Sequence, residues 1–252
     1  MTVGEFYEAV KAFAPPELAA EGDRCGLLVG RKDRPCAAVL CALDITDAVL
    51  DEAEGLGAQV ILAHHPLFWQ LTEITQSSRE GHTALRLCES GIAAICMHTN
   101  LDKARGGVND SLAAFFLAEP YEVIGGGFCR AGRVARPMPM PAFAAEAKQK
   151  LGSGAVRYHD SGRQVRYLAV GSGNCASELP YVLETGCDTF LTGDIKHSVF
   201  LDAAYHGINL IDCGHYATEV VVFERLAPAL GAICGDVRLH ISKAQAEPYL
   251  CR

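Results

Sequence analysis

The sequence lacks three features that would place the protein at a membrane or on a nucleic acid. No apolar run approaches the roughly 20 residues that a membrane-spanning helix requires, and the N-terminus lacks the charged-then-apolar layout of a signal peptide. Lys and Arg number 22 against 30 Asp and Glu, for a net charge of −8. That balance disfavours a basic groove for a nucleic-acid backbone. We therefore expect a cytoplasmic protein that binds neither membranes nor nucleic acid.

Several familiar motifs are also missing. None of the eleven cysteines forms a C-x-x-C pair, and their odd number and irregular spacing argue against a disulfide framework or a zinc ribbon. Several lie in apolar runs, where a free thiol behaves as a small core residue. The G-x-x-x-x-G-K-[ST] loop is absent, and no Ser–His–Asp or Cys–His pattern stands out. Histidines and carboxylates are therefore the candidates for carrying any chemistry.

Strand and helix patterns alternate along the chain, and they repeat. Residues 38–65 and 167–194 both read as an apolar strand, a turn, a helix, a glycine and a second apolar strand. Residues 89–102 and 205–219 extend the parallel with a glycine, another buried strand and polar residues. This alternation predicts an α/β protein with largely parallel pairing. An internal duplication explains the similarity better than the alternative, which is that any two strand–helix units share such a residue pattern.

Residues 135–154 read as a connection between two lobes. Prolines alternate at 137, 139 and 141, which excludes a regular helix or a central strand there. A short helix is expected to follow, through Lys150. We therefore predict an N-terminal α/β lobe over residues 1–134 and a C-terminal α/β lobe over residues 135–252.

Polar residues gather where the apolar strands end. The segments AHHP, MHTNLD, TGDIKH and CGHYATE each follow such a strand. Ligands of α/β sheets bind just outside the carboxyl ends of the strands, so we expect a functional site there.

The doublet of His64 and His65 is followed at once by Pro66. Neighbouring side chains of a strand point to opposite faces, and the proline ends regular pairing. At a strand end, the two imidazoles can therefore diverge and meet different ions of a metal pair. One core histidine beside one exposed histidine is the alternative interpretation.

Asp102 follows the next strand end, and its carboxylate is suited to bridging two cations; a capping role is the alternative. His215 and Glu219 are four residues apart, which places them on one face of a first helical turn. Glutamate is also common in a first turn because of the helix dipole. With the histidine doublet, these residues form a set of imidazoles and carboxylates that suits two divalent ions of zinc, iron or manganese. Five protein ligands leave open positions on two metals, which is typical of a reactive site.

The ordered motifs AHHPLFW, HTNLD, TGDIKH and GHYATE resemble those of the NIF-three-like dinuclear-metal-centre proteins, whose bacterial members are often labelled GTP cyclohydrolase 1 type 2 homologues. The resemblance extends from GLLVG at 26–30 and ALDIT at 42–46 to Glu219, and the chain matches the short form of the family. It departs at GDRCGLL, where the family usually has a Trp-Asp-Asn-like stretch; Asp23 remains.

The resemblance implies two similar α/β lobes with a dinuclear metal site in the cleft between them, and a toroidal homohexamer. The metal ligands that it implies are His64, His65, Asp102, His215 and Glu219. Candidates for supporting those ligands are His98, Asn100, Asp194 and His197, whereas surface or core roles are expected for His82, His159, His206 and His240.

The sequence leaves two functions open. The first is a metal-dependent hydrolase, with metal-activated water attacking a nucleotide or phosphoester; opening of the GTP imidazole ring is the reaction that the resemblance suggests. The second is a non-catalytic metal-binding scaffold or regulatory interaction protein. The many candidates for supporting the ligands favour the enzyme. A nucleic-acid clamp is disfavoured, because the one basic stretch, residues 24–34, contains an acid.

Overall fold

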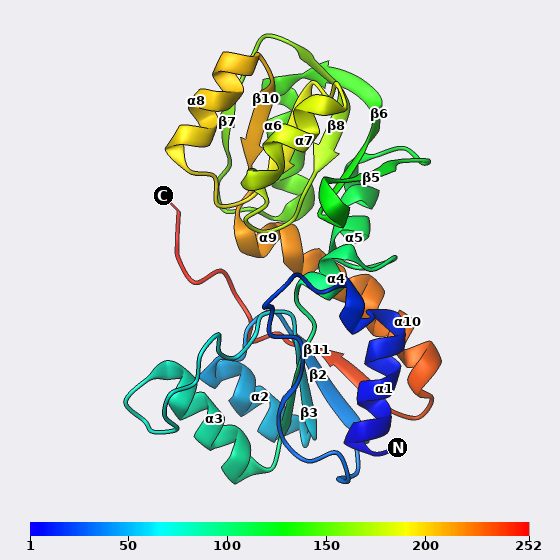
Figure 1. The fold of residues 1–252 in the computed structure, drawn as a ribbon, viewed down its shortest axis with the longest axis vertical. Helices are drawn as coiled ribbons and strands as arrows, with labels where there is room; N and C mark the ends of the chain where they lie inside the picture. Colours follow the sequence, from blue (N-terminus) through cyan, green and yellow to red (C-terminus); the bar gives the residue numbers. More distant parts are fainter. Residues whose placement is uncertain (252) are drawn as a thin grey trace. The chain divides into compact units, whose positions relative to one another are not determined.

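The computed structural model describes residues 1–251, and its contacts divide the chain into two compact units. Unit 1 contains residues 1–107 and 223–246, and unit 2 contains residues 108–222 together with the residues from 247 onward. Each unit has one mixed sheet with helices (Figure 1). The predicted class of two similar α/β lobes is confirmed. Among the described residues, no helix is both long and apolar enough to cross a membrane.

The strands of unit 1 are β1 (Gly26–Val29), β2 (Ala38–Ala42), β3 (Val60–Ala63), β4 (Ala93–Cys96) and β11 (Arg238–Ile241). Its helices are α1 (Val3–Phe13), α2 (Asp47–Leu56), α3 (Arg79–Ser90), α4 (Thr99–Lys103) and α10 (Phe223–Cys234), with the 3-10 turn η1 (Pro16–Leu18). The sheet order is β1-β4-β3-β2-β11, and only β1 runs antiparallel to its neighbour.

Both faces of the unit 1 sheet are covered, which explains why every residue of β2, β3 and β4 is buried. Apolar residues of α2 and α3 pack on one face, around Leu40 and Ile61. Helices α1 and α10 contact each other, and α10 contacts β2 (Figure 1). Local sequence sets the helix ends: the Thr46 hydroxyl accepts a hydrogen bond from the Val49 N–H, and Gly57 ends α2 in the left-handed conformation.

The strands of unit 2 are β5 (Glu122–Ile124), β6 (Cys129–Pro139), β7 (Arg157–His159), β8 (Gln164–Val170), β9 (Thr189–Thr192) and β10 (Asn209–Asp212). Its helices are α5 (Val108–Phe116), α6 (Met140–Leu151), α7 (Leu179–Glu184), α8 (His197–His206) and α9 (His215–Glu219), with the 3-10 turns η2 (Gly125–Gly127), η3 (Ala176–Glu178) and η4 (Val220–Val222). The sheet order is β5-β6-β8-β9-β10-β7.

The predicted repeats fold alike. Strands β2, β3 and β4 are neighbours in parallel, and so are β8, β9 and β10. In each unit, an antiparallel strand then borders the last of the three, β1 in unit 1 and β7 in unit 2. The repeated pattern in the sequence is therefore a repeated parallel sheet.

The division of the chain differs from the single boundary predicted between residues 134 and 135. The first crossing comes after Gly107, and residues 223–246 return to unit 1. The reason is β11, which pairs in parallel with β2 along residues 238–241. Such a pairing joins segments about 200 residues apart, and no local pattern reveals it.

The interpretation of residues 135–154 as a connection between lobes is wrong, because the segment lies within unit 2. Strand β6 continues through Pro137 to Pro139, and it pairs with β8 again at Met138 after a register shift. Strand β5 pairs only with the first residues of β6, so the prolines lie where one side of β6 has no strand partner in that sheet. The helix predicted through Lys150 is confirmed as α6.

Candidate metal centre

The candidate ligands of unit 1 lie at the carboxyl ends of β3 and β4. His64 and His65 follow β3, and their backbone N–H groups donate to Ala42 O and Leu43 O, at 3.1 and 2.8 Å. Backbone hydrogen bonding toward residues 42 and 43 therefore continues through the doublet beyond the end of β3, and Pro66 has no N–H with which to extend it. Asp102 lies in the short helix α4, which begins three residues after β4 ends.

His64 is fully buried, and both of its ring nitrogens have neighbours. Nδ1 lies 2.8 Å from the carbonyl oxygen of Met97. Because a carbonyl only accepts hydrogen bonds, Nδ1 carries a proton, and in the neutral imidazole Nε2 then carries the lone pair. Nε2 lies 3.6 Å from Asp102 Oδ1, so the lone pair and the carboxylate lie close together.

Two further imidazoles of unit 1 are fixed by carboxylates. His65 Nδ1 lies 2.9 Å from Asp44 Oδ1, and His98 Nδ1 lies 2.9 Å from Asp23 Oδ1. Burial raises the pKa of Asp23, but the hydrogen bonds from His98 and Thr99 outweigh it and hold that pKa well below its usual range. One ring nitrogen from each of His64, His65 and His98 lies within 4.8 Å of the others, which is the spacing of a metal-ligand group.

The candidate ligands of unit 2 lie on α9, directly after β10. His215 Nε2 is 3.1 Å from Glu219 Oε2, and His215 Nδ1 is 2.8 Å from Asp194 Oδ2. Glu219 is buried, with 4% of its surface exposed. It packs so closely on Gly173 that a Cβ atom at that position would overlap Glu219 Oε1. His215 and Glu219 therefore lie side by side on one helical turn, and their role as metal ligands stays a prediction.

The same aspartate–histidine contact occurs in both units. Asp44 and His65 are 21 residues apart, and so are Asp194 and His215. In each case an aspartate beyond the end of one parallel strand holds the Nδ1 of a histidine beyond the end of the next. Asp194 has a φ of +50°, an uncommon conformation for a residue other than glycine and one that is frequent at functional sites.

The other predicted residues divide into two groups. His98 and Asp194 lie beside the candidate ligands, as described above. The buried Asn100 instead donates from Nδ2 to Ala14 O at 2.8 Å, so it supports the end of α1. His197 is exposed at the start of α8 and belongs to no metal-ligand group among residues 1–251.

Sequence reasoning did not assign a role in the site to Asp44 or Asp23. For Asp44, a signal was present: it follows β2 as Asp194 follows β9, with the same separation from the next candidate ligand. For Asp23, the signal was its retention where the family usually has a Trp-Asp-Asn-like stretch, but its partner His98 is 75 residues away, so the contact itself could not be predicted.

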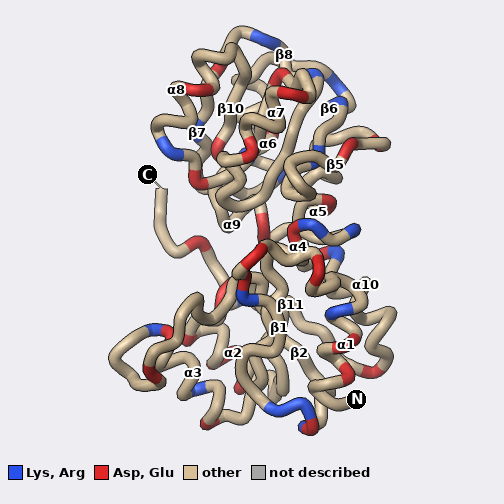
Figure 2. The backbone as a smooth tube through the Cα atoms, viewed as in Figure 1, with Lys and Arg blue, Asp and Glu red and all other residues tan. Residues whose placement is uncertain are grey.

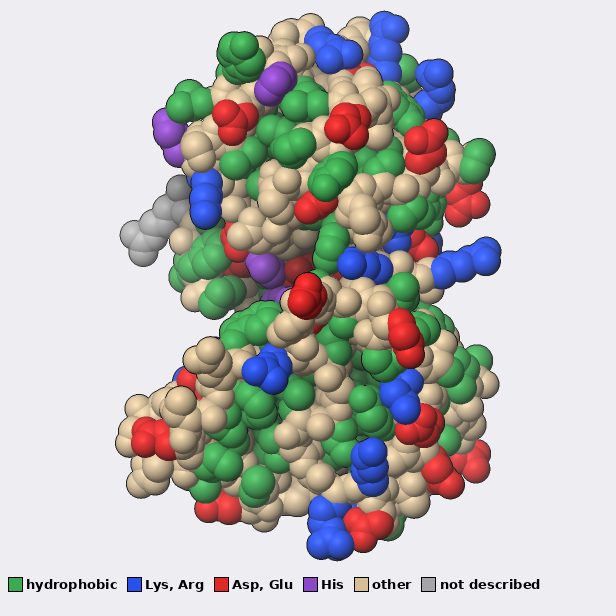
Figure 3. All heavy atoms as spheres, in the orientation of Figure 1, with side chains coloured by type: hydrophobic (Ala, Val, Ile, Leu, Met, Phe, Trp, Pro, Cys, Tyr) green, Lys and Arg blue, Asp and Glu red, His purple; other side chains and the backbone are tan. Residues whose placement is uncertain are grey.

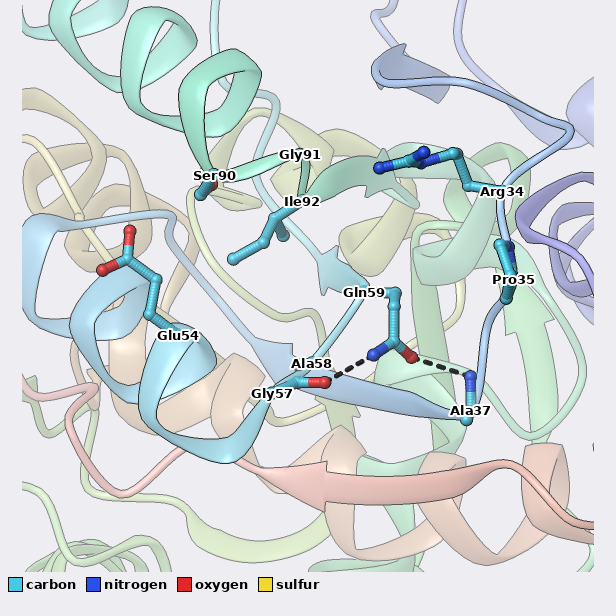
Figure 4. A pocket seen from close by; sticks show the side chains of 10 residues that line it. All are labelled: Arg34, Pro35, Ala37, Glu54, Gly57, Ala58, Gln59, Ser90, Gly91 and Ile92. Atoms are coloured by element: carbon cyan, nitrogen blue, oxygen red, sulfur yellow. Dashed lines mark hydrogen bonds between the residues drawn. The ribbon is translucent and has the colours of Figure 1, made fainter.

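A pocket of about 640 Å³ lies at the opposite ends of the unit 1 strands (Figure 4). Gln59 in its lining is hydrogen-bonded to the chain itself: Oε1 accepts from the Ala37 N–H, and Nε2 donates to Gly57 O. Gln59 precedes β3, whereas His64 follows it. The pocket is therefore separate from the candidate ligands.

Charges of both signs are interspersed along each unit (Figure 2), and the visible surface mixes them with hydrophobic side chains (Figure 3). Neither view shows the basic stripe that a nucleic-acid backbone requires.

The family model for Duf34/NIF3 (NGG1p interacting factor 3) matches residues 1–248. The chain belongs to this family. The GTP cyclohydrolase 1 type 2 homolog of Streptomyces coelicolor is 32% identical, over 98% of this chain and 93% of that protein. These matches confirm the resemblance carried by the histidine, aspartate and glutamate motifs.

Solved structures of NIF3 proteins and their relatives share the fold. The Bacillus cereus protein related to NIF3 has a TM-score of 0.93 at 23% identity, over 100% of this chain and 99% of its own. A hypothetical protein of Staphylococcus aureus has a TM-score of 0.91 at 27% identity, with the same coverage. The fold of this NIF3 chain is thus shared over its whole length.

Proposed function

We propose that this NIF3 protein binds two divalent metal ions and hydrolyses a nucleotide or phosphoester, with ring opening of GTP as the first reaction to test. The observation that carries the proposal is that His64, His65 and His215 each have an acceptor at Nδ1. In the neutral imidazole, that contact leaves Nε2 with the lone pair that a metal requires. The ligands in this proposal are those three histidines, Asp102 and Glu219.

The chemistry of these side chains fits zinc, iron or manganese. The set contains imidazoles and carboxylates but no thiolate. Its members come from both units, and we include in the proposal that the two groups of ligands join in one metal centre. When bound, such a metal pair supplies Lewis-acid charge stabilisation and lowers the pKa of water.

The residues beside the ligands have separate tasks. Asp44 and Asp194 orient the imidazoles of His65 and His215. His98, with its Nδ1 proton held by Asp23, presents Nε2 as a proton acceptor beside the His64 and His65 rings, whose centroids lie 5.3 and 6.0 Å away.

The names of relatives support the nucleotide class. The Streptomyces coelicolor and Lactococcus lactis proteins are named GTP cyclohydrolase 1 type 2 homolog. The family description names an interaction instead, NGG1p interacting factor 3, and it supports the second candidate, a metal-binding scaffold or regulatory partner protein. A homohexamer with a toroidal shape is proposed for either function.

The deciding experiment combines elemental analysis with a substrate screen on one metal-loaded sample. We expect two divalent ions per chain, and turnover of GTP or of a phosphodiester. Asp102→Ala is expected to lose both metal and turnover, whereas Asp33→Ala, at an exposed aspartate paired with Arg31, is expected to keep them.

Turnover of the wild-type protein no greater than that of the Asp102→Ala variant contradicts the hydrolase. The scaffold then predicts that His215→Ala weakens assembly or partner binding. Unchanged assembly and binding in that metal-deficient variant contradict the scaffold.

A further inference from the structure

Two buried thiols of unit 2 lie side by side. Cys129 begins β6, and Cys175 precedes the 3-10 turn η3. Their Sγ atoms are 3.5 Å apart, and their exposed fractions are 0% and 6%. The two residues are 46 positions apart in the chain, so only the fold brings them together.

The backbone around these sulfurs is well anchored. Gly171 N–H donates to Leu191 O at 2.9 Å, and Cys175 N–H donates to Thr192 Oγ1 at 3.1 Å. A Cβ atom on Gly171 would lie 2.7 Å from the Cys175 sulfur and 2.9 Å from the Cys129 sulfur. Because Gly171 has no side chain, both sulfurs can lie against its backbone.

We propose that Cys129 and Cys175 are a redox-active dithiol, a modification site for low-molecular-weight disulfides such as oxidised glutathione. A disulfide bond is about 2.05 Å long, so the sulfurs need to approach each other by only about 1.5 Å. Cys175 is the more exposed residue of the two, so in this proposal it is the one that the reagent reaches first.

The reaction proceeds by two exchanges. The Cys175 thiolate attacks one sulfur of the small disulfide, forms a mixed disulfide and releases one small thiolate. The Cys129 thiolate then attacks Cys175 Sγ and releases the second small thiolate, which leaves the protein disulfide. The two cysteine protons are transferred to the released thiolates. The protein loses two electrons, and the reagent is reduced to two thiols.

The pair is connected to the unit 2 ligands by a short loop. Gly173, two residues before Cys175, packs against Glu219, and its N–H donates to Thr218 Oγ1 at 2.9 Å. Closing the disulfide displaces Cys175 and with it this loop, which disturbs the surroundings of Glu219. Oxidation therefore weakens metal retention. This consequence rests on the proposed function, whereas disulfide formation does not.

A third buried thiol is less suited to the reaction. Cys187 is close to Thr185, whose hydroxyl lies 3.1 Å from its sulfur. No contact between its sulfur and that of Cys129 or Cys175 is found among the described residues, in contrast to the 3.5 Å that separates those two. Cys187→Ser is thus the matched control for Cys175→Ser.

The test uses the full chain, metal-loaded, with the exposed Cys88 and Cys251 replaced by serine. The protein is treated with oxidised glutathione, alkylated, digested with trypsin and analysed by tandem mass spectrometry. We expect residues 106–130 linked to residues 167–196 through Cys129 and Cys175, with reversal by dithiothreitol. The link persists in Cys187→Ser and is lost in Cys175→Ser.

Gly171→Ala provides a second variant, because it keeps both thiols and inserts a methyl group between them. We expect its circular dichroism to match the wild type and its cross-link to be strongly reduced. A link through Cys187, or no link when glutathione disulfide is in large excess, overturns the proposal.

Metal retention is read by transfer of zinc to a chelating dye. We expect oxidation to speed zinc transfer about tenfold, because disturbing a residue that supports a metal ligand weakens metal binding. In Cys175→Ser, we expect the rate of zinc transfer to be the same with and without oxidised glutathione. Equal transfer from the oxidised and reduced proteins overturns the coupling. If the reduced protein holds no zinc, the proposed metal centre fails, while the peptide map still decides whether the disulfide forms.

Discussion

Each candidate histidine ligand has a defined partner at Nδ1: a backbone carbonyl for His64, and an aspartate for His65 and His215. Such a partner fixes the tautomer and the direction of the ring, and a carboxylate also makes Nε2 a better donor. These contacts therefore orient the three rings as the proposed metal centre requires.

Removing one of these partners tests the idea. In Asp194→Ala, the His215 ring loses its acceptor, and we expect metal affinity to fall by about 10–100-fold. Competition with a chelator of known affinity measures the change.

The matched control for this prediction is Asp202→Ala, at an exposed aspartate on α8, which is expected to bind metal like the wild type. Equal affinity in the Asp194→Ala variant would show that His215 is oriented by something other than Asp194.

At the scale of the element, one helix holds the segment that follows β11. Glu52 on α2 accepts hydrogen bonds from Ser242 Oγ at 2.6 Å and from the N–H groups of Lys243 and Ala244 at 3.1 Å. Burial raises the pKa of Glu52, but these hydrogen bonds outweigh it and lower that pKa. The carboxylate thus helps to keep residues 242–244 on unit 1.

This contact predicts a pH-dependent effect of Glu52→Gln. A carboxyl group with a lower pKa in the folded protein than in the unfolded chain stabilises the folded protein at a pH above its unfolded pKa, which is about 4.3 for glutamate. This contribution is lost as the pH falls from the unfolded pKa through the folded pKa. We expect Glu52→Gln to be less stable than the wild type at pH 7, and the gap to narrow below about pH 4.

Urea unfolding at a series of pH values measures the difference in the free energy of unfolding. Glu21→Gln, at an exposed glutamate of the same unit, is expected to show no such trend. A constant gap from pH 7 to pH 3 would mean that the carboxylate charge of Glu52 does not contribute.

At the scale of the whole molecule, the chain passes between the two units after residues 107, 222 and 246. Each unit completes its own sheet, and each carries its own part of the proposed ligand set. The proposed metal centre therefore requires both units.

The proposed assembly has a direct measurement. We expect light scattering of the metal-loaded protein after gel filtration to give six times the chain mass of 26.9 kDa. Closed rings of identical subunits satisfy all of their interfaces, so we expect one sharp species over a tenfold range of concentration. A monomer throughout that range would contradict the hexamer.

Much of the fold was predictable because its signals are local. The apolar strands, the caps such as Thr46 and Gly57, and the repeated strand–helix pattern all lie within short segments. The prolines of 137–141 misled the prediction, because a proline in a strand is excluded only where its missing N–H faces a partner strand, and that is a property of the sheet.

The candidate site shows the same limit. His64, His65, Asp102, His215 and Glu219 could be selected from the sequence, because each follows a strand in a compact polar motif. The role of Asp23 could not, since it depends on a contact with His98 across 75 residues.

The sequence by itself determined the α/β class, the repeated parallel strands and the histidine and carboxylate motifs, since these depend on the order of neighbouring residues. Only the tertiary structure decided that β11 returns to the first sheet, that Asp44 and Asp23 hold histidine rings, and that Cys129 lies beside Cys175. Each of these is a contact between separate segments, and packing and hydrogen bonding of the folded chain select such contacts.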